Sequence, residues 1–276
     1  MKLKTFRQKF GTIKKVINLN IIFLDFDGVL DTYQNVSYKD IDKKIKILSK
    51  ITNLYKCKVV IEASSKSSID EDTKEISSDF VKHILDKFKE YNIEYIGKTP
   101  SIRVYYNNYS YQDLWKEDEI RIYLLRHPEI EHFCIIDDND YTDLTKLYSY
   151  LVTTKMFGKT KDDEGLTEDN ILEIANILKK ENIYKEDDNE AVHDIHLLNT
   201  IIMEDDIERF QDILLKLIPE LSIINKDKLN KLIDELNQLP KSFDQRIKLI
   251  LNNLEKESIN KFINRYNLKE KKVIKL

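Results

Sequence analysis

The sequence predicts an α/β protein: a Rossmann-like, three-layer sandwich around a parallel sheet, followed by an all-helical C-terminal appendage. Short continuous apolar runs alternate with longer amphipathic stretches from about residue 19 to about residue 180. This alternation is typical of parallel strands that helices cover on both faces. All five glycines lie at or before Gly165, so the last 111 residues (276 − 165) contain none. A region without glycine is poorly suited to tight β-turns and favours helices.

The expected strands and helices follow one another in the order of a doubly wound sheet. Apolar runs rich in Ile, Val and Phe predict the strands, and apolar residues at intervals of three or four predict the helices. Right-handed crossovers then place helices on both faces of the sheet. The expected strands are 21–24, 59–61, 93–96, 133–136 and 151–153, and the expected helices are approximately 40–55, 72–91, 116–126 and 168–180.

The character of the chain changes after residue 180. Residues 181–220 contain twelve acidic side chains and three Lys or Arg, whereas residues 221–276 contain seven acidic side chains and thirteen Lys or Arg. Helical spacing recurs in four series of apolar residues, which begin at Ile207, Leu229, Phe243 and Ile259. We therefore expect a first domain over residues 1–182 and a helical bundle domain over residues 183–276, for which the sequence indicates no role.

The composition excludes several classes of protein. Hydrophobic residues make up 41% and charged residues 34%, and the net charge is −4, which argues against a generic cationic wrapper of duplex DNA. No apolar stretch approaches the roughly 18–20 residues that a membrane span needs. The two cysteines, Cys57 and Cys134, lie inside apolar runs. We therefore expect neither a disulfide scaffold nor a cysteine zinc site, and we expect a cytoplasmic protein.

The strongest chemical signal follows the first expected strand. Residues 21–24 are apolar, and Asp25-Phe26-Asp27-Gly28 comes directly after them. Ligands of doubly wound sheets bind at the carboxyl ends of the strands. Two carboxylates so close repel each other, so a bound cation is the natural explanation for their placement. Gly28 lets the backbone turn away and leaves both side chains open to a ligand.

This D-x-D-G-V run resembles the first motif of the haloacid dehalogenase (HAD) phosphohydrolase superfamily. The resemblance implies that Asp25 attacks phosphorus and becomes an aspartyl phosphate, while Asp27 is the general acid and base. It also implies Mg²⁺ as the cofactor, held by the Asp25 carboxylate and the backbone carbonyl of Asp27. The chemistry agrees, because a carboxylate that attacks an anionic phosphoryl group needs a cation to offset the repulsion.

Two further positions match what the family needs around the phosphoryl group. The resemblance implies that Ser64, with Ser65 as the runner-up, donates a hydrogen bond to the phosphoryl oxygens after the second strand. It implies a cation as well. Lys116 is our choice because Lys116-Glu117-Asp118-Glu119-Ile120 is similar to a stretch of the HAD branch found in RNA-repair proteins, which is related to polynucleotide 3′-phosphatases. Lys98 and Arg103 are the competing cations.

The fourth strand again ends in adjacent carboxylates. Asp137 and Asp138 follow Phe133-Cys134-Ile135-Ile136, and hard oxygen ligands at a rigid strand end suit Mg²⁺. In the HAD family such residues complete the Mg²⁺ shell. We expect Asp140 and Asp143 to shape the loop or to cap the following helix.

Further along the chain, Gly165-Leu166-Thr167 is similar to the G-L-T that opens the last helix of the RNA-repair branch, and Thr167 is expected to cap that helix. The chain departs from this branch in the second motif. Members of the branch commonly have S-S-W-R, whereas this chain has Ser64-Ser65-Lys66 and an unusual Glu62. Lys66 supplies a charge in place of arginine but not a planar clamp for phosphate. Two locations for Glu62 stay open, the metal site and the solvent.

The sequence therefore predicts a Mg²⁺-dependent phosphohydrolase that acts on a phosphorylated substrate, with a polynucleotide 3′-phosphate or a nucleotide as the candidate. A short first insertion leaves no room for a large cap, and a second insertion before Lys116 is rich in rings, which either stack on a base or pack the loop onto the domain. The rings are Tyr105, Tyr106, Tyr109, Tyr111 and Trp115. The alternatives are a non-catalytic HAD-like module that binds a protein partner through its helical domain, and a small-metabolite phosphatase. The sequence does not predict the oligomeric state.

Overall fold

The computed structural model describes residues 19–35, 37–70, 72–102, 116–139, 147–179 and 195–266. Five parallel strands form one sheet in the order β3-β2-β1-β4-β5. They are β1 (Leu19–Leu24), β2 (Cys57–Ile61), β3 (Glu94–Lys98), β4 (Ile130–Asp137) and β5 (Leu151–Thr153). The predicted parallel α/β fold is therefore confirmed, and β1 lies at its centre.

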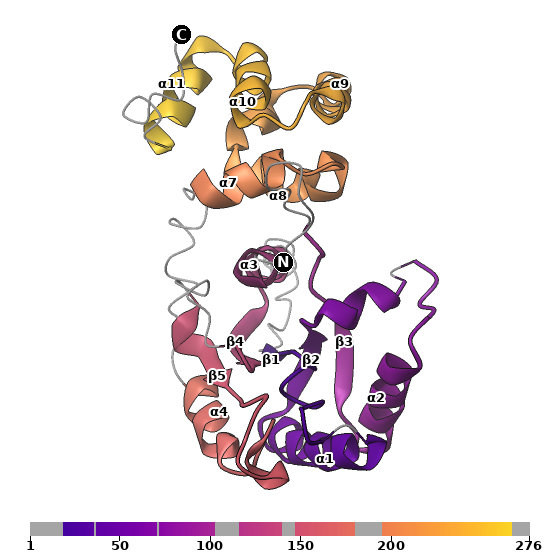
Figure 1. Ribbon diagram of the computed structural model, residues 1–276. Coiled ribbons are helices and arrows are strands. Elements are labelled where there is room, and N and C mark those ends of the chain that lie inside the picture. Colours follow the sequence, from indigo (N-terminus) through magenta and orange to yellow (C-terminus); the bar gives the residue numbers. More distant parts are fainter. Residues whose placement is uncertain are drawn as a thin grey trace, which may run out of the picture.

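Helices cover both faces of the sheet. α1 (Tyr38–Tyr55), α2 (Asp79–Glu90) and α4 (Asn170–Leu178) lie on one face, where α1 contacts both α2 and α4, and α3 (Lys116–Arg126) lies on the other (Figure 1). Ser37 begins α1 by accepting a hydrogen bond from the backbone N–H of Asp40, which satisfies one of the donors that a helix leaves unpaired at its start.

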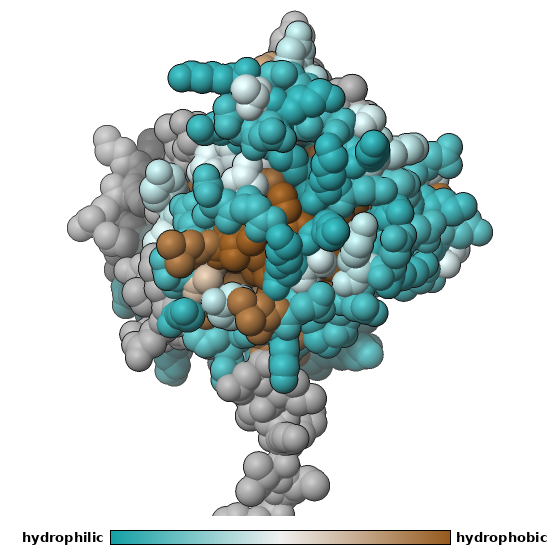
Figure 2. Space-filling view, turned by 90° about the horizontal axis from the view of Figure 1, so that it is seen from below, coloured by the Kyte–Doolittle hydropathy of each residue, from teal (hydrophilic) through white to brown (hydrophobic). Residues whose placement is uncertain are grey.

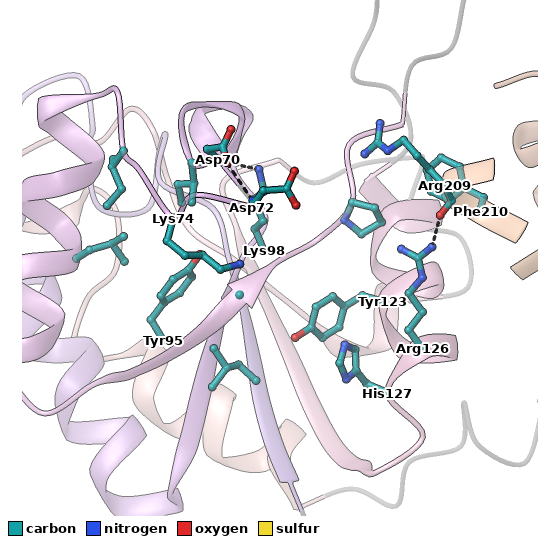
Figure 3. A pocket seen from close by; sticks show the side chains of 16 residues that line it. Asp70, Asp72, Lys74, Tyr95, Lys98, Tyr123, Arg126, His127, Arg209 and Phe210 are labelled. Atoms are coloured by element: carbon teal, nitrogen blue, oxygen red, sulfur yellow. Dashed lines mark hydrogen bonds between the residues drawn. The ribbon is translucent and has the colours of Figure 1, made fainter. Parts of the chain in front are cut away.

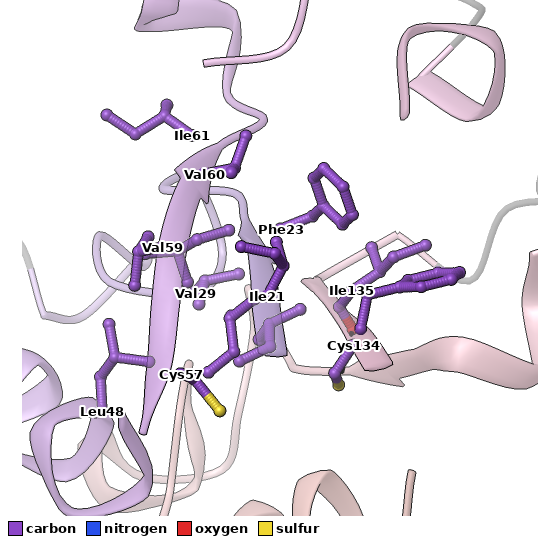
Figure 4. Packing of buried hydrophobic residues seen from close by; sticks show 14 of the residues in the cluster. Ile21, Phe23, Val29, Leu48, Cys57, Val59, Val60, Ile61, Cys134 and Ile135 are labelled. Atoms are coloured by element: carbon purple, nitrogen blue, oxygen red, sulfur yellow. Dashed lines mark hydrogen bonds between the residues drawn. The ribbon is translucent and has the colours of Figure 1, made fainter. Parts of the chain in front are cut away.

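The central strand is buried on both faces. Ile21, Ile22, Phe23 and Leu24 have no exposed surface, and their neighbours from β2, β4 and α1 pack around them (Figure 4). The Phe23 ring meets the Tyr123 ring of α3 edge to face, with centroids 5.6 Å apart. A continuous apolar run is required in β1 because helices cover this central strand on both faces. Cys57 of β2 and Cys134 of β4 are both buried in these strands and do not form a disulfide with each other.

Residues 195–266 form helices throughout, as the absence of glycine predicts. They are α7 (Ile195–Ile202), α8 (Gln211–Leu217), α9 (Lys226–Gln238), α10 (Phe243–Asn252) and α11 (Lys256–Arg265), with short 3-10 turns η4 (Ile207–Phe210) and η5 (Pro219–Ile223). Their apolar faces form a second buried cluster. α7 was not predicted from the sequence. The predicted domain boundary falls within 180–194, outside the described residues, so the two-domain division stays a prediction.

α3 lies between the sheet and the C-terminal helices (Figure 1). Ile120 and Leu124 belong to the apolar cluster of the sheet, whereas Ile122 and Leu125 belong to the cluster of the C-terminal helices. Polar contacts join the same surfaces: the Thr200 hydroxyl donates to Asp118 over 3.0 Å, and Arg126 forms two hydrogen bonds with the Asp212 carboxylate. The C-terminal helices therefore pack directly on the helix that Lys116 begins.

One helix starts later than the sequence predicts. The helix expected from residue 72 begins at Asp79, because Ile69 and Ile76 pair in an antiparallel bridge and Asp72 and Thr73 lie in a turn between them. The Asp70 carboxylate accepts the backbone N–H groups of Asp72 and Thr73 within this turn. An aspartate that bonds the backbone just ahead of it stabilises a turn in competition with a helix.

The surface formed by α1 and α4 is partly apolar. Seen from this side, apolar residues gather near the middle of the face within a hydrophilic surround (Figure 2). Leu54 of α1 and Leu172 of α4 are each 69% exposed. None of the described helices combines the length and the apolar character needed to cross a membrane.

Candidate active site

Three carboxylates meet at the carboxyl ends of β1 and β4. Asp25 follows β1, Asp137 ends β4 and Asp138 follows it, and one oxygen of each lies within 4.8 Å of the others. The register explains the meeting, since Leu24 lies opposite Ile136 and the Asp25 N–H donates to the Ile136 carbonyl over 3.0 Å. Residues about 110 positions apart in the sequence are thus brought together by strand pairing alone.

The turn after Asp25 makes room for Asp138. Gly28 has a φ of 68°, and a Cβ at this position would lie 2.1 Å from the Asp138 Cγ, so glycine is required both for the backbone conformation and for the close approach. The Phe26 carbonyl accepts three N–H groups that follow it, and the Thr154 hydroxyl donates to the Gly28 carbonyl over 2.7 Å. Hydrogen bonds within the turn and a hydrogen bond from the loop after β5 therefore hold the turn in place.

Lys116 brings a cation to two of the three carboxylates. Its ammonium donates to Asp25 Oδ2 and, over 2.6 Å, to Asp137 Oδ2. The side chain is 15% exposed, so little water screens these contacts. Of the competing cations, Lys98 instead donates to the backbone carbonyls of Lys66 and Ile69, and Arg103 lies outside the described residues.

Burial dominates the acid–base properties of the carboxylates. It raises the pKa of Asp25 to about 6. The charge of Lys116 lowers this pKa, and the charge of Asp137 raises it further. Burial also raises the pKa of Asp137 and of Asp138 above their ordinary values. Such raised values mean that the site favours partners that offset negative charge.

Asp27 and Ser64 lie on the solvent side of this cluster. Both residues are exposed, and the Ser64 hydroxyl donates to Asp27 Oδ2 over 3.5 Å. Ser64 begins a short 3-10 helix, η1 (Ser64–Ser68), directly beyond the end of β2. Ser65, the runner-up, is half-buried, and its carbonyl accepts the Ser68 hydroxyl over 2.8 Å. The Asp27 carboxylate is not one of the three clustered oxygens.

Glu62 and Lys66 form a buried ion pair next to the end of β2. Glu62 is 1% exposed and is not one of the three clustered carboxylates, and Lys66 Nζ lies 3.2 Å from both of its oxygens. Lys66 also donates to Thr99 over 2.8 Å and to Glu119 of α3. Two buried carboxylates, Glu62 and Glu119, therefore share the charge of Lys66, the residue that stands in place of the arginine of the RNA-repair branch.

This buried cluster of Glu62, Lys66, Thr99 and Glu119 ties β2 to α3. Glu119 lies one helical turn after Lys116, and its second oxygen accepts the Ile102 N–H over 2.7 Å. Burial raises the pKa of Glu62 well above its ordinary value. Burial alone would lower the pKa of Lys66, but Glu62 and Glu119 outweigh it and raise that pKa. No pattern in the sequence predicted this cluster, because nothing local pairs residue 66 with residue 119.

Glu164 is a second residue whose role the sequence did not indicate. Its carboxylate accepts the Thr32 hydroxyl, the Gln34 N–H and the Gly158 N–H over 2.8–3.0 Å. It thereby joins the loop after β1 to the loop after β5. The cap predicted at Thr167 was wrong in detail, because the Thr167 hydroxyl donates to the Asn170 side chain and α4 begins at Asn170.

The three carboxylates fit a small divalent cation. They offer hard oxygens from two rigid strand ends, and Gly28 leaves the space that the Asp138 carboxylate fills. Mg²⁺ prefers such oxygens and keeps several waters when few protein ligands are present. Asp25, Asp137 and Asp138 would hold the ion, and the Asp27 carbonyl is the further ligand that the family pattern implies.

Mg²⁺ is expected to raise the melting temperature of the protein more at about pH 7.5 than at about pH 5, because ligation requires deprotonated carboxylates. Below pH 6 protons compete for Asp25, whose pKa is about 6 without metal. Thermal unfolding with and without Mg²⁺ at both pH values measures this difference. Equal shifts at the two pH values, or an undiminished shift in Asp138→Asn, would count against the site.

Several predicted residues lie outside the described part of the chain. They are Asp140, Asp143, Tyr105, Tyr106, Tyr109, Tyr111 and Trp115, and their predicted roles stay predictions.

Comparison with known proteins assigns the family. No curated protein and no solved structure matches this chain. A family model described as "HAD domain in Swiss Army Knife RNA repair proteins" matches residues 21–171, more than half of the chain. The match covers the strand ends at Asp25 and Asp137, the start of η1 and the whole of α3. The chain therefore belongs to this family of HAD domains.

Proposed function

We propose that this protein is a Mg²⁺-dependent phosphohydrolase that acts through an aspartyl phosphate on Asp25. Membership of a HAD family suggests a hydrolase of phosphate esters. The observation that supports the proposal most is the placement of Asp25: a buried carboxylate next to Asp137 and Asp138 that shares the Lys116 ammonium with Asp137. An ordinary acidic turn would not hold three carboxylates and a lysine together away from water.

In the first step, an Asp25 oxygen attacks the phosphorus of the substrate, and the bond from phosphorus to the leaving oxygen breaks. Asp25 is ionised above its pKa of about 6, so the nucleophile is ready at neutral pH. Lys116 stabilises the negative charge that Asp25 and the phosphoryl group bring together. Bound Mg²⁺ would supply further positive charge against the phosphoryl oxygens.

Asp27 moves the protons. Asp27 is exposed and lies two residues after the nucleophile Asp25. It gives a proton to the leaving oxygen and later takes one from the water that attacks phosphorus. That water breaks the bond between phosphorus and Asp25 and releases inorganic phosphate. Ser64, whose hydroxyl is within 3.5 Å of Asp27 Oδ2, donates to a phosphoryl oxygen during the transfer.

The candidate substrate is the terminal phosphate of a polynucleotide or a nucleotide. The printed description of the family names RNA repair. The loop between Gly28 and α1 is short and is held down by Glu164 through Thr32 and Gln34, so this insertion forms no large cap over Asp25. A site without a large cap at this position admits the end of a long molecule.

Release of inorganic phosphate from a small aryl phosphate tests the proposal. We expect turnover with Mg²⁺, none after chelation, and recovery when Mg²⁺ is added back. A folded, Mg²⁺-binding protein that hydrolyses neither aryl phosphates nor phosphorylated nucleotides and oligonucleotides would instead indicate a non-catalytic module. Comparing oligonucleotide 3′-phosphates with sugar phosphates separates a polynucleotide phosphatase from a small-metabolite phosphatase.

A further inference from the structure

A pocket of about 670 Å³ lies where the sheet edge, α3 and the C-terminal helices meet. Its floor is the edge strand β3, and one wall is the end of α3 together with η4. The other wall is formed by Ile69, Asp70, Asp72, Lys74 and Ile76. Figure 3 shows Lys74 and Lys98 on one side and Arg126, His127 and Arg209 on the other. The volume is in the range of roughly 300–1,000 Å³ typical of ligand pockets, which often lie between structural units.

The charge of the lining favours an anion. Four Lys or Arg side chains line the pocket (Lys74, Lys98, Arg126 and Arg209) against two aspartates, Asp70 and Asp72. Arg126 is paired with Asp212, and Lys98 donates to two backbone carbonyls. Arg209 is exposed, and its guanidinium lies 5.6 Å from the centre of the Phe210 ring. An exposed guanidinium at the edge of a pocket can pair with a phosphate through two parallel hydrogen bonds.

Flat side chains line the same pocket. The His127 ring stacks on the buried Tyr123 ring with centroids 4.3 Å apart and an interplanar angle of 27°, and Tyr95 is half-buried on the floor. Gly97 lies in the edge strand, beside an irregularity in its pairing with β2. Glycine in a strand often marks a place where a ligand approaches the backbone closely. Rings beside cations are the combination that binds single-stranded nucleic acid.

One short 3-10 helix, η1, connects the candidate active site to the pocket. η1 begins at Ser64, beside Asp27, and Ile69 directly after its end lines the pocket. Five residues of 3-10 helix rise about 2 Å each, which places the pocket roughly 10 Å from Ser64. Stacked nucleotides rise about 3.4 Å each, so this distance corresponds to two or three nucleotides.

We propose that this pocket binds a nucleotide two or three positions from the end of a single-stranded polynucleotide whose terminal phosphate lies at Asp25. The proposal rests on the proposed function for the placement of the terminal phosphate. Arg209 pairs with the phosphate of the bound nucleotide, and the ring of His127 faces its base or sugar. The C-terminal helices then have a role in recognition, because η4 supplies Arg209 to one wall.

Binding tests the pocket without turnover. In an Asp25→Asn background, a fluorescent single-stranded oligonucleotide with a 3′-phosphate is titrated with Arg209→Glu and with the matched control Lys248→Glu. Lys248 is exposed on α10 and is not part of the pocket. We expect Arg209→Glu to weaken binding about tenfold, as loss of a charge-assisted phosphate contact implies. Equal affinities for the two variants would overturn the proposal.

Turnover separates failure of the pocket from failure of the proposed function. In the otherwise native protein, we expect Arg209→Glu to lower the ratio of kcat/KM on the oligonucleotide to kcat/KM on a small aryl phosphate about tenfold, through KM. In the native protein, we also expect kcat/KM to rise as the oligonucleotide is lengthened to about four nucleotides. We expect Arg209→Glu to abolish this rise. An unchanged ratio would overturn the pocket and leave the phosphatase intact. Absence of all hydrolysis would overturn the phosphatase, and the binding comparison would still decide on the pocket.

Discussion

Replacing Asp25 by asparagine is expected to lower kcat on any phosphate ester at least about 10⁴-fold, the scale seen when a covalent nucleophile is removed. Asparagine has the same shape, but its amide is a poor nucleophile and cannot form the aspartyl phosphate. The side chain is only 7% exposed, so water cannot easily replace it as the attacking group. Initial rates of phosphate release under saturating Mg²⁺ measure the effect.

The control for this experiment is Asp169→Asn, an equal loss of one carboxylate at an exposed position before α4, where the side chain makes no capping hydrogen bond. Its kcat is expected to stay within about twofold of that of the native protein. Circular dichroism establishes that both variants are folded. Activity of Asp25→Asn comparable to that of the control would refute the assignment of the nucleophile.

Replacing Lys66 by methionine is expected to lower the free energy of unfolding by about 3–5 kcal/mol, the usual cost of removing one partner of a buried ion pair. Two carboxylates, Glu62 and Glu119, would lose the ammonium that they share. The loss is expected to be smaller at about pH 5 than at about pH 8, because burial raises the pKa of Glu62 well above its ordinary value, and a protonated Glu62 needs no cation. Denaturant unfolding at both pH values measures it.

Two further variants test whether the loss of stability comes from the unpaired buried carboxylates or from the change of lysine to methionine itself. Lys82→Met removes an exposed lysine of α2 and is expected to change the free energy of unfolding by less than about 0.5 kcal/mol. Adding Glu62→Gln and Glu119→Gln to Lys66→Met is expected to recover part of the stability, since no buried charge then stays unpaired. A triple variant less stable than Lys66→Met would contradict the account of the cluster.

The fold and the family were predictable because each depends on local patterns. The apolar run before Asp25 and the one before Asp137 identify two parallel strands, and parallel strands bring their carboxyl ends to one edge of the sheet. The match of the family model to residues 21–171 confirms the resemblance that the D-x-D-G-V run indicated. The structure also places Lys116 beside Asp25, although its role and those of the other site residues stay proposals.

What the sequence could not predict depends on contacts between distant residues. Glu62 and Lys66 look like polar turn residues until α3 brings Glu119 to them. Glu164 resembles the acidic residues before it, Asp162 and Asp163, and only the folded loops give it four donors. Four helices were predicted from their apolar series, whereas α7 (Ile195–Ile202) was not, although its polar residues His196, Asn199 and Thr200 fall at helical spacing.

Mapping the phosphoryl group on the protein tests the central claim most directly. Asp27→Asn slows the attack of water on the intermediate, so a reaction quenched after one turnover of an aryl phosphate should hold phosphate on the enzyme. The account predicts that peptide mass spectrometry finds this phosphoryl group on Asp25 and finds none in Asp25→Asn. A phosphoryl group on Ser64 or on any residue other than Asp25, or turnover by Asp27→Asn in which no covalent phosphate ever forms, would contradict it.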